Sequence, residues 1–390
     1  MVLLLTGFAG ATVLAISRAP APRPAWADRS GASPLRGIAR ATAARRIGQA
    51  TAMPQNEPRP PALSTPAPRA HSTAPITAPQ PAFLQTCGPT FCEHGSKVAL
   101  YGASTLGGLD DPSGRLRLAR AAHLNVVRIV NFLDEESPDP TTAPFDVSRW
   151  ARVDREIATA NDLGLRVILD LSTYRNLLRH EHRNPYIVDW DPFVRFVADR
   201  VNTVTGIRYR DDPSIAIISI AGEVEPLTTL IPMTPTTAQL TEFYARTIGE
   251  LHRSDPHHLV SSGGLLQLDW PSGIDWRAIF ALPGNDVPAI HVYSDRDEQV
   301  TLPAVAAETE RLGKPWLLEE FGFPQTRGDA ARAAAFRRTY DEAAAGHAAG
   351  TLFWDLGPEL VGVGGKPDTY DVGPGTPATL AEVLAHAPPA

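Results

Sequence analysis

Short apolar runs alternate with longer amphipathic segments over most of the chain. Runs of strand length, rich in Val, Ile and Leu, lie at 98–102, 125–130, 165–171, 215–221, 258–262, 289–293, 316–320 and 351–355. Helical periodicity lies between and after them, at 147–163, 192–204, 235–253, 304–312, 329–348 and 377–385. Runs that are apolar at consecutive positions are typical of strands buried on both faces, which belong to parallel sheets covered by helices.

This alternation predicts parallel βα units. Eight such units over about 300 residues match the (β/α)8 TIM barrel, an α/β fold. The main rival is a doubly wound open sheet, but no Gly-rich phosphate loop follows any of the early strands. The pattern therefore predicts a TIM barrel.

The first 82 residues differ in composition from the rest. Residues 1–17 (MVLLLTGFAGATVLAIS) are apolar, have the length of a signal peptide and predict a signal peptide or an N-terminal anchor. Residues 18–82 are dominated by Ala, Pro, Arg, Ser and Thr, which predicts a disordered Pro/Ala-rich linker because such a composition cannot bury a core. The barrel domain is expected over 83–390, in a protein that is secreted or tethered to the cell surface.

Charge and cysteine usage exclude some classes of protein. A net charge of −7 argues against nucleic-acid binding, which needs a basic face. Cys87 and Cys92 are the only cysteines; they predict a short disulfide loop, since a metal site needs more ligands than this pair provides. The i, i+2 histidines of 180–182 do not share a helical face and predict a solvated loop. No metal or cofactor is expected.

Two of the apolar runs end in carboxylates. Residues 215–221 lead to Glu223, and 316–318 lead to Glu319 and Glu320. Desolvated carboxylates are costly, and the C-terminal strand ends of a parallel barrel carry its chemistry. Two acids meeting there can protonate a leaving oxygen and stabilise an oxocarbenium-like carbon, which indicates glycoside hydrolysis. The alternative is that each Glu only caps a strand or pairs with an arginine.

Several ordered segments resemble glycoside hydrolase family 5, a family of barrels with acids on strands four and seven. They are NVVRIV, TGIRYRDDPSIAIISIAGEVEP, HVYS, KPWLLEEFG and TLFWDL. The resemblance implies that Glu223 is the general acid/base and Glu320 the nucleophile, with Glu225 and Glu319 as competing assignments. Strand alternation predicts that Glu319 and Glu320 face opposite sides, so that only one of them points into the barrel mouth.

The same resemblance implies four substrate-binding residues. Arg128 is expected beside the nucleophile, where its charge keeps Glu320 ionised. His291 and Tyr293 form the family's HxY pair, whose tyrosine hydroxyl bonds the nucleophile, and Trp354 offers an aromatic platform to a sugar. The alternatives are an arginine that bridges to a surface acid, a satisfied core histidine and a core tryptophan.

The chain departs from the family beside the acid/base. Gly222 stands where the family normally has an Asn that hydrogen-bonds the sugar 2-hydroxyl, and Val224 stands where Pro is frequent. That contact strengthens in the transition state, so its loss bears on substrate preference. It also leaves open an inactive relative.

The resemblance as a whole implies a monomeric, retaining glycosidase acting on a polysaccharide or oligosaccharide with β-links. The segments TGIRYRDDPSI and EEFG favour β-1,4-mannan or a related polymer. A membrane contact is expected only through the N-terminal segment. The alternatives are a non-catalytic, surface-tethered glycan-binding barrel, a cellulase-like β-glucanase, or a hydrolase of another kind on the same fold.

Overall fold

The computed structural model of the chain describes residues 82–108, 111–133, 142–224, 236–266, 274–357 and 370–387. The predicted signal or anchor segment, the linker as far as residue 81, and Glu225 lie outside the described residues. The first described residues lead directly into the first strand at Gln85, within two residues of the predicted start of the barrel domain at 83.

One parallel sheet of nine strands forms the centre of the described part of the chain. Its order is β8-β7-β6-β5-β4-β12-β11-β10-β9. The strands are β4 (Leu100–Leu106), β5 (Val126–Val130), β6 (Arg166–Asp170), β7 (Ile215–Ser219), β8 (Leu259–Ser261), β9 (Gly264–Leu265), β10 (Ala289–Val292), β11 (Leu317–Phe321) and β12 (Gly350–Phe353).

The two outer members of this sheet, β8 and β9, are halves of one broken strand. β8 pairs with β7, whereas β9 pairs with β10, and only Ser262-Gly263 separate them. Gly263 has φ +87°, and a Cβ there would lie 2.4 Å from the backbone nitrogen of Gly222, so the break requires glycine. The broken strand closes the sheet into an eight-stranded barrel, which confirms the predicted TIM fold.

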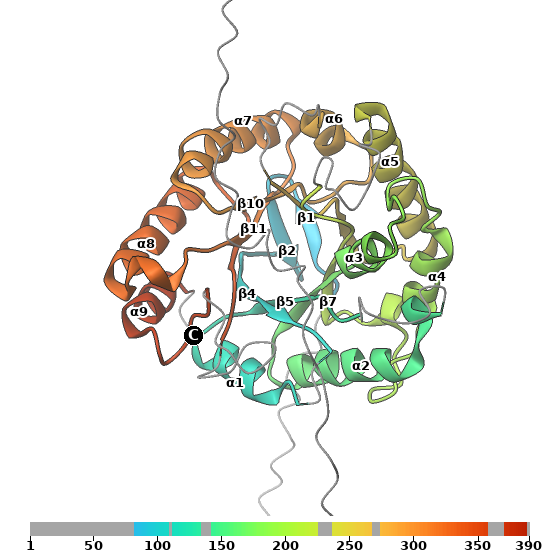
Figure 1. The fold of residues 1–390 in the computed structure, drawn as a ribbon, viewed down its shortest axis with the longest axis horizontal. Coiled ribbons are helices and arrows are strands. Elements are labelled where there is room, and N and C mark those ends of the chain that lie inside the picture. Colours follow the sequence, from blue (N-terminus) through green and yellow to red (C-terminus); the bar gives the residue numbers. More distant parts are fainter. Residues whose placement is uncertain are drawn as a thin grey trace, which may run out of the picture. The chain divides into compact units, whose positions relative to one another are not determined.

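Helices surround the strands (Figure 1). They are α1 (Ser113–Ala121), α2 (Val147–Asp162), α3 (Ser172–His180), α4 (Asp191–Asp199), α5 (Thr237–Ser254), α6 (Trp276–Ala281), α7 (Leu302–Leu312), α8 (Asp329–Ala345) and α9 (Pro377–His386). Short helical turns add η1 (Ala143–Phe145), η2 (Tyr209–Asp211), η3 (Asp297–Thr301) and η4 (Gln325–Arg327). Local signals set several ends: Thr236 and Gln239 form a capping box before α5, and Gly313 ends α7 at φ 64°.

A small antiparallel sheet closes the N-terminal end of the barrel. It consists of β1 (Gln85–Cys87), β2 (Thr90–Glu93) and β3 (Ser96–Val98), and the predicted Cys87–Cys92 disulfide joins its first two strands. Leu84 and Phe91 are buried in one apolar cluster with residues from the strands of the barrel. This end of the barrel is therefore filled with apolar side chains, which leaves the opposite end for polar chemistry.

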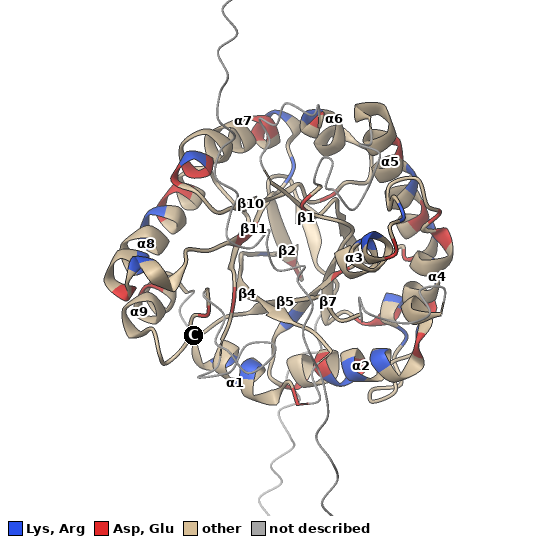
Figure 2. Cartoon of the chain, viewed as in Figure 1, with Lys and Arg blue, Asp and Glu red and all other residues tan. Residues whose placement is uncertain are grey.

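A larger apolar cluster lies between the sheet and the helices, where it includes Trp150, Trp190 and Phe336. Charged residues of both signs are interspersed along the outer helices (Figure 2). Among the described residues, no helix combines the length and apolar character needed to cross a bilayer.

All eight predicted barrel strands and all six predicted helices are present, with boundaries shifted by a few residues. Helices α1, α3 and α6 were not predicted. α4 ends at Asp199, five residues early, because the guanidinium of Arg200 turns to bind the buried Asp154. The prediction of a solvated loop at 180–182 is wrong at His180, because this residue is the last one of α3.

Candidate active site

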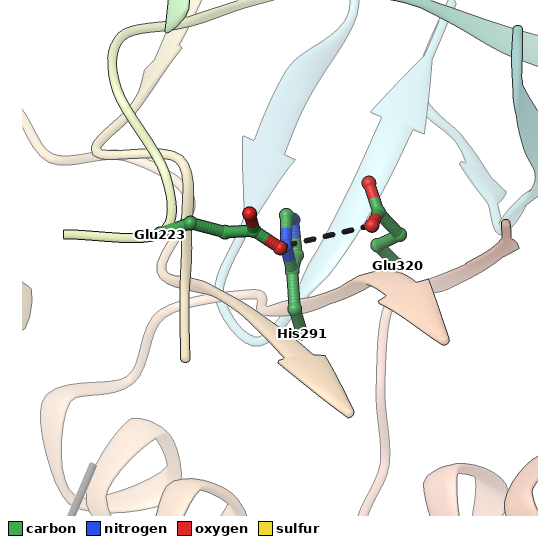
Figure 3. Close-up of side chains that lie close together, drawn as sticks. All are labelled: Glu223, His291 and Glu320. Atoms are coloured by element: carbon green, nitrogen blue, oxygen red, sulfur yellow. Dashed lines mark hydrogen bonds and ion pairs between the residues drawn. The ribbon is translucent and has the colours of Figure 1, made fainter. Parts of the chain in front are cut away.

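Six polar side chains meet at the C-terminal end of the barrel. They are Arg128 from β5, Glu223 just after β7, His291 from β10, Tyr293 just after β10, and Glu319 and Glu320 from β11. The imidazole of His291 lies between the carboxylates of Glu223 and Glu320 (Figure 3). The structure thus brings the two predicted catalytic acids together, and an oxygen of one lies within 4.8 Å of an oxygen of the other.

Arg128 is the cationic centre of this group. Its guanidinium is buried and donates to Asp170 (Nε–Oδ2 2.8 Å), to Ser104 (3.0 Å) and to Glu320. Burial alone lowers the pKa of Arg128, but the charges of Asp170, Glu319 and Glu320 outweigh it and raise that pKa well above its ordinary value. The predicted position of Arg128 beside Glu320 is therefore present, and the arginine has no surface partner among these contacts.

A β-bulge turns both Glu319 and Glu320 into the barrel. Ile290 pairs with Leu318 and His291 with Glu320, so Glu319 is an extra residue on β11, and the pairing with β12 shifts at the same place. The prediction that only one of the two acids faces the mouth is wrong. A bulge interrupts the alternation of side chains on which that prediction depended.

His291 has a carboxylate at each ring nitrogen. Nδ1 lies 2.9 Å from Glu223 Oε1, and Nε2 lies 3.3 Å from Glu319 Oε2. Burial alone lowers the pKa of His291, but Glu320, Glu223 and Glu319 together raise it to about 10. These contacts favour the protonated ring, whereas a core histidine would have apolar neighbours.

Glu223 stands in an unusual backbone conformation. Its φ is 51°, a region that costs a non-glycine residue free energy and recurs at functional sites. Its N–H donates to Gly264 O (2.8 Å), and its own carbonyl accepts from Arg175 (3.2 Å). Burial alone raises the pKa of Glu223, but His291, Arg175 and Arg128 outweigh it and lower that pKa. The Glu223 side chain is 21% exposed, more than any other acid of the group.

Gly222 packs against the broken strand formed by β8 and β9, which is the fifth strand of the barrel when β4 is counted as the first. A Cβ at this position would lie 2.7 Å from Gly264 O and 2.9 Å from Gly264 N. The strand backbone occupies the space that a side chain would need. In this barrel, the Asn expected from the family has no room at position 222.

Tyr293 and Trp354 also lie at this end of the barrel. The Tyr293 hydroxyl donates to Glu320, and its ring packs edge-on against Tyr370 at 5.8 Å. Burial and the charges of Glu320 and Glu223 raise the pKa of Tyr293, so the hydroxyl keeps the proton that it donates. Trp354 follows β12 and is partly exposed. Its backbone N–H donates to the backbone carbonyl of Phe321 (2.7 Å), the residue after Glu320.

One group of three ligand-type residues in the described part of the chain has a spacing that a metal ion could use: Glu223, His291 and Glu320. The same atoms already form hydrogen bonds and ion pairs with one another and with Arg128 and Tyr293. We therefore interpret the group as an acid–base cluster.

Sequence reasoning missed several members of the site. Asp170 stands at the end of β6 and could have been found by the same rule that found Glu223 and Glu320, a carboxylate where a buried strand stops. Ser219 and Gly264 carry no such signal, yet both bind Glu319.

Comparison with known proteins agrees with this geometry. Residues 93–360 match the model of the family described as Cellulase (glycosyl hydrolase family 5). Mannan endo-1,4-beta-mannosidase 1 of Oryza sativa subsp. japonica is 28% identical over 229 residues, which span 50% of this chain and 51% of the relative. Mannan endo-1,4-beta-mannosidase 3 of Arabidopsis thaliana is 27% identical over 295 residues, 60% of this chain and 69% of the relative. The solved endo-1,4-beta-mannanase of Rhizomucor miehei shares the fold at TM-score 0.66 and 22% identity, over 78% of this chain and 98% of that one.

Proposed function

The chain belongs to glycosyl hydrolase family 5, and from this premise we propose that it hydrolyses β-1,4-linked mannan with retention of configuration. It is a glycosidase that acts on O-glycosyl bonds. In this proposal Glu320 is the nucleophile and Glu223 the general acid/base. Arg128, His291, Tyr293 and Trp354 contact the substrate or orient the two acids.

One observation carries the proposal. Oxygens of Glu223 and Glu320 approach within 4.8 Å at the C-terminal end of the barrel. Retaining glycosidases hold their two carboxyl groups about 5–5.5 Å apart, whereas inverting enzymes leave about 6.5–9.5 Å for a water molecule. The short gap supports direct attack by one carboxylate.

The environments of the two acids support this division of roles. Arg128 and Tyr293 both donate to Glu320, so this carboxylate is held in place and aimed, as a nucleophile requires. Glu223 is the more exposed acid and bonds the protonated His291, from which it can regain a proton.

The chemistry then runs in two steps. Glu320 attacks the anomeric carbon while Glu223 passes to the departing glycosidic oxygen the proton that it shares with His291, which leaves a covalent glycosyl-enzyme. Glu223 next takes a proton from water, whose oxygen attacks the same carbon and releases Glu320. Two inversions at one carbon give net retention.

The preference for mannan is supported by the curated relatives named above, both of which are called mannan endo-1,4-beta-mannosidases. A matched panel of mannan, glucomannan and carboxymethyl-cellulose tests the preference. Hydrolysis of carboxymethyl-cellulose alone would favour the β-glucanase alternative, and hydrolysis of none would favour the glycan-binding barrel.

Product stereochemistry tests the mechanism. NMR of the first hydrolysis product should reveal the β-anomer before mutarotation, and the α-anomer would refute retention. Glu223→Ala should slow substrates with poor leaving groups by at least about 100-fold, and activated aryl glycosides far less, because only the former need a proton. An equal loss on both would count against acid/base duty.

The proposed location is outside the cell, either secreted or tethered to its surface. The Cys87–Cys92 disulfide supports export, since such bonds persist in oxidising compartments. The proposed partner is a polysaccharide or oligosaccharide, bound by a monomer.

A further inference from the structure

Glu319 is a buried acid that the two-step mechanism does not use. Its side chain has no exposed surface, yet it accepts from Ser219 Oγ (2.8 Å) and from Gly264 N (2.6 Å). Its carboxylate also lies 3.3 Å from His291 Nε2 and 3.7 Å from Arg128 Nε. An ionised carboxylate at such depth is costly unless it is paired, and four groups from four strands pair it.

The contacts of Glu319 depend on the bulge in β11. Without the extra residue, alternation would turn this side chain toward the helices. The broken fifth strand supplies the other half of the arrangement, because the N–H of Gly264 is its donor and a Cβ on Gly264 would lie 1.9 Å from the His291 ring. Two irregular strands thus place one carboxylate against one imidazole.

The proton count of His291 follows from its neighbours. Ionised carboxylates only accept hydrogen bonds, so a ring with Glu223 at one nitrogen and Glu319 at the other must donate from both. The other charged or titratable groups that face the ring region are Glu320 from β11, Arg128 from β5 and Tyr293 from its own segment. Acids outnumber cations around the ring.

We propose that Glu319 is a positioning residue that holds His291 as a doubly protonated imidazolium, clamped between Glu319 and the acid/base Glu223. The clamp fixes the ring orientation and keeps a proton beside Glu223. Glu223 and His291 then titrate as a coupled pair, and the negative charge of Glu319 increases the affinity of that pair for its proton.

The wild-type protein provides the first test. In a 15N-labelled sample at pH 7.5, both ring nitrogens of His291 should carry the chemical shifts of a protonated imidazole. The signals are assigned by their loss in His291→Gln. Shifts of a neutral tautomer at this pH would overturn the proposal, whatever any variant does.

Glu319→Gln then separates charge from hydrogen bonding. The carbonyl oxygen of the new glutamine can replace Oε2 of Glu319 as the acceptor for Gly264 and His291. The glutamine NH2 group can donate to Ser219, whose hydroxyl rotates to accept. The His291 midpoint should fall by at least about one pH unit, a tenfold loss of proton affinity. An unchanged midpoint in folded protein would mean that Glu319 only supports the backbone.

The pH–rate profile is the second readout, and it rests on the proposed function. In Glu319→Gln the alkaline limb of kcat/KM should move to lower pH, because the pair loses its proton earlier. Glu156→Gln is the matched control: Glu156 is as deeply buried, lies on α2, and should leave the limb in place. Absence of any glycosidase activity would refute the function, whereas the NMR result would still decide the role of Glu319.

Discussion

Two buried polar clusters in this protein have opposite designs. Around Asp154, between α2 and the segment after α4, one carboxylate meets one guanidinium: Asp154 accepts from Arg200 twice (2.8 and 2.6 Å), from Tyr209 (2.7 Å) and from Thr203. Charges balance, and both carboxylate oxygens accept more than one hydrogen bond. Around Arg128, several carboxylates share one arginine and one histidine, and Glu223 stays partly exposed.

The difference separates stability from chemistry. A saturated, neutral cluster has one low-energy arrangement and joins two elements of the fold. A cluster with surplus acids and a solvent-accessible member has groups whose protonation can change during a reaction, and functional sites concentrate such groups. Substitutions in the two clusters should therefore affect different observables.

The largest effect is expected from Glu320→Ala in the barrel-mouth cluster. Turnover of mannan should fall by roughly 10⁴-fold or more, because no other group can form the covalent intermediate. Thermal unfolding should change little. Glu242→Ala, which removes an exposed glutamate on α5, is the control and should leave turnover near the wild-type rate. Turnover near the wild-type rate would remove Glu320 from the mechanism.

Asp154→Ala should do the reverse. Removing one partner of a buried pair leaves Arg200 without its counter-charge and costs about 3–5 kcal/mol in the free energy of unfolding. Activity per folded molecule should stay near wild type. Asp199→Ala breaks an exposed pair with Arg210 on the neighbouring helix and should cost less than about 1 kcal/mol. If urea titrations gave both variants the same loss in free energy of unfolding, the proposed difference between the two clusters would be wrong.

Gly222→Asn tests the close approach beside Glu223. Although it restores the residue usual in the family, it should destabilise the fold by about 1–3 kcal/mol and lower kcat, because its Cβ collides with the backbone of Gly264. Gly114→Asn, at a position where a Cβ would meet nothing within 4 Å, is the control. A gain in activity with unchanged melting temperature would contradict this account.

The smallest effect on activity is expected at Glu156, a buried acid that belongs to neither cluster, where a substitution should instead change how stability depends on pH. Burial raises the pKa of Glu156 to about 8, opposed by a hydrogen bond from Gly108 and by the charge of Arg115. A raised folded-state pKa contributes stability below the ordinary pKa of 4.5, and that contribution is lost as pH rises through about 8. Glu156→Gln should therefore gain stability relative to wild type as pH rises from 5 to 8, by roughly 3–4 kcal/mol, because each unit of pKa shift corresponds to about 1.4 kcal/mol. An identical pH dependence of melting in both proteins would show that Glu156 is ionised throughout.

Much of this architecture could be predicted from the sequence. Apolar runs located all eight barrel strands, and the carboxylates that follow two of them located Glu223 and Glu320 at one end. Helices α1, α3 and α6 escaped prediction because each is only six to nine residues long, so that few turns are available to reveal a period. The inward turn of Glu319 escaped because alternation is a rule for regular pairing, and nothing in LLEEF marks an extra residue.

The chain's composition and periodicity determined by themselves that a parallel barrel forms and which end bears acids, since both follow from where apolar stretches begin and stop. Only the tertiary structure decided how many acids converge and what each contacts. The register of β11 depends on two neighbouring strands at once, and the place of Gly222 depends on a break in the fifth strand 40 residues later in the chain. Such pairings are long-range, so their geometry exists only when the barrel has closed.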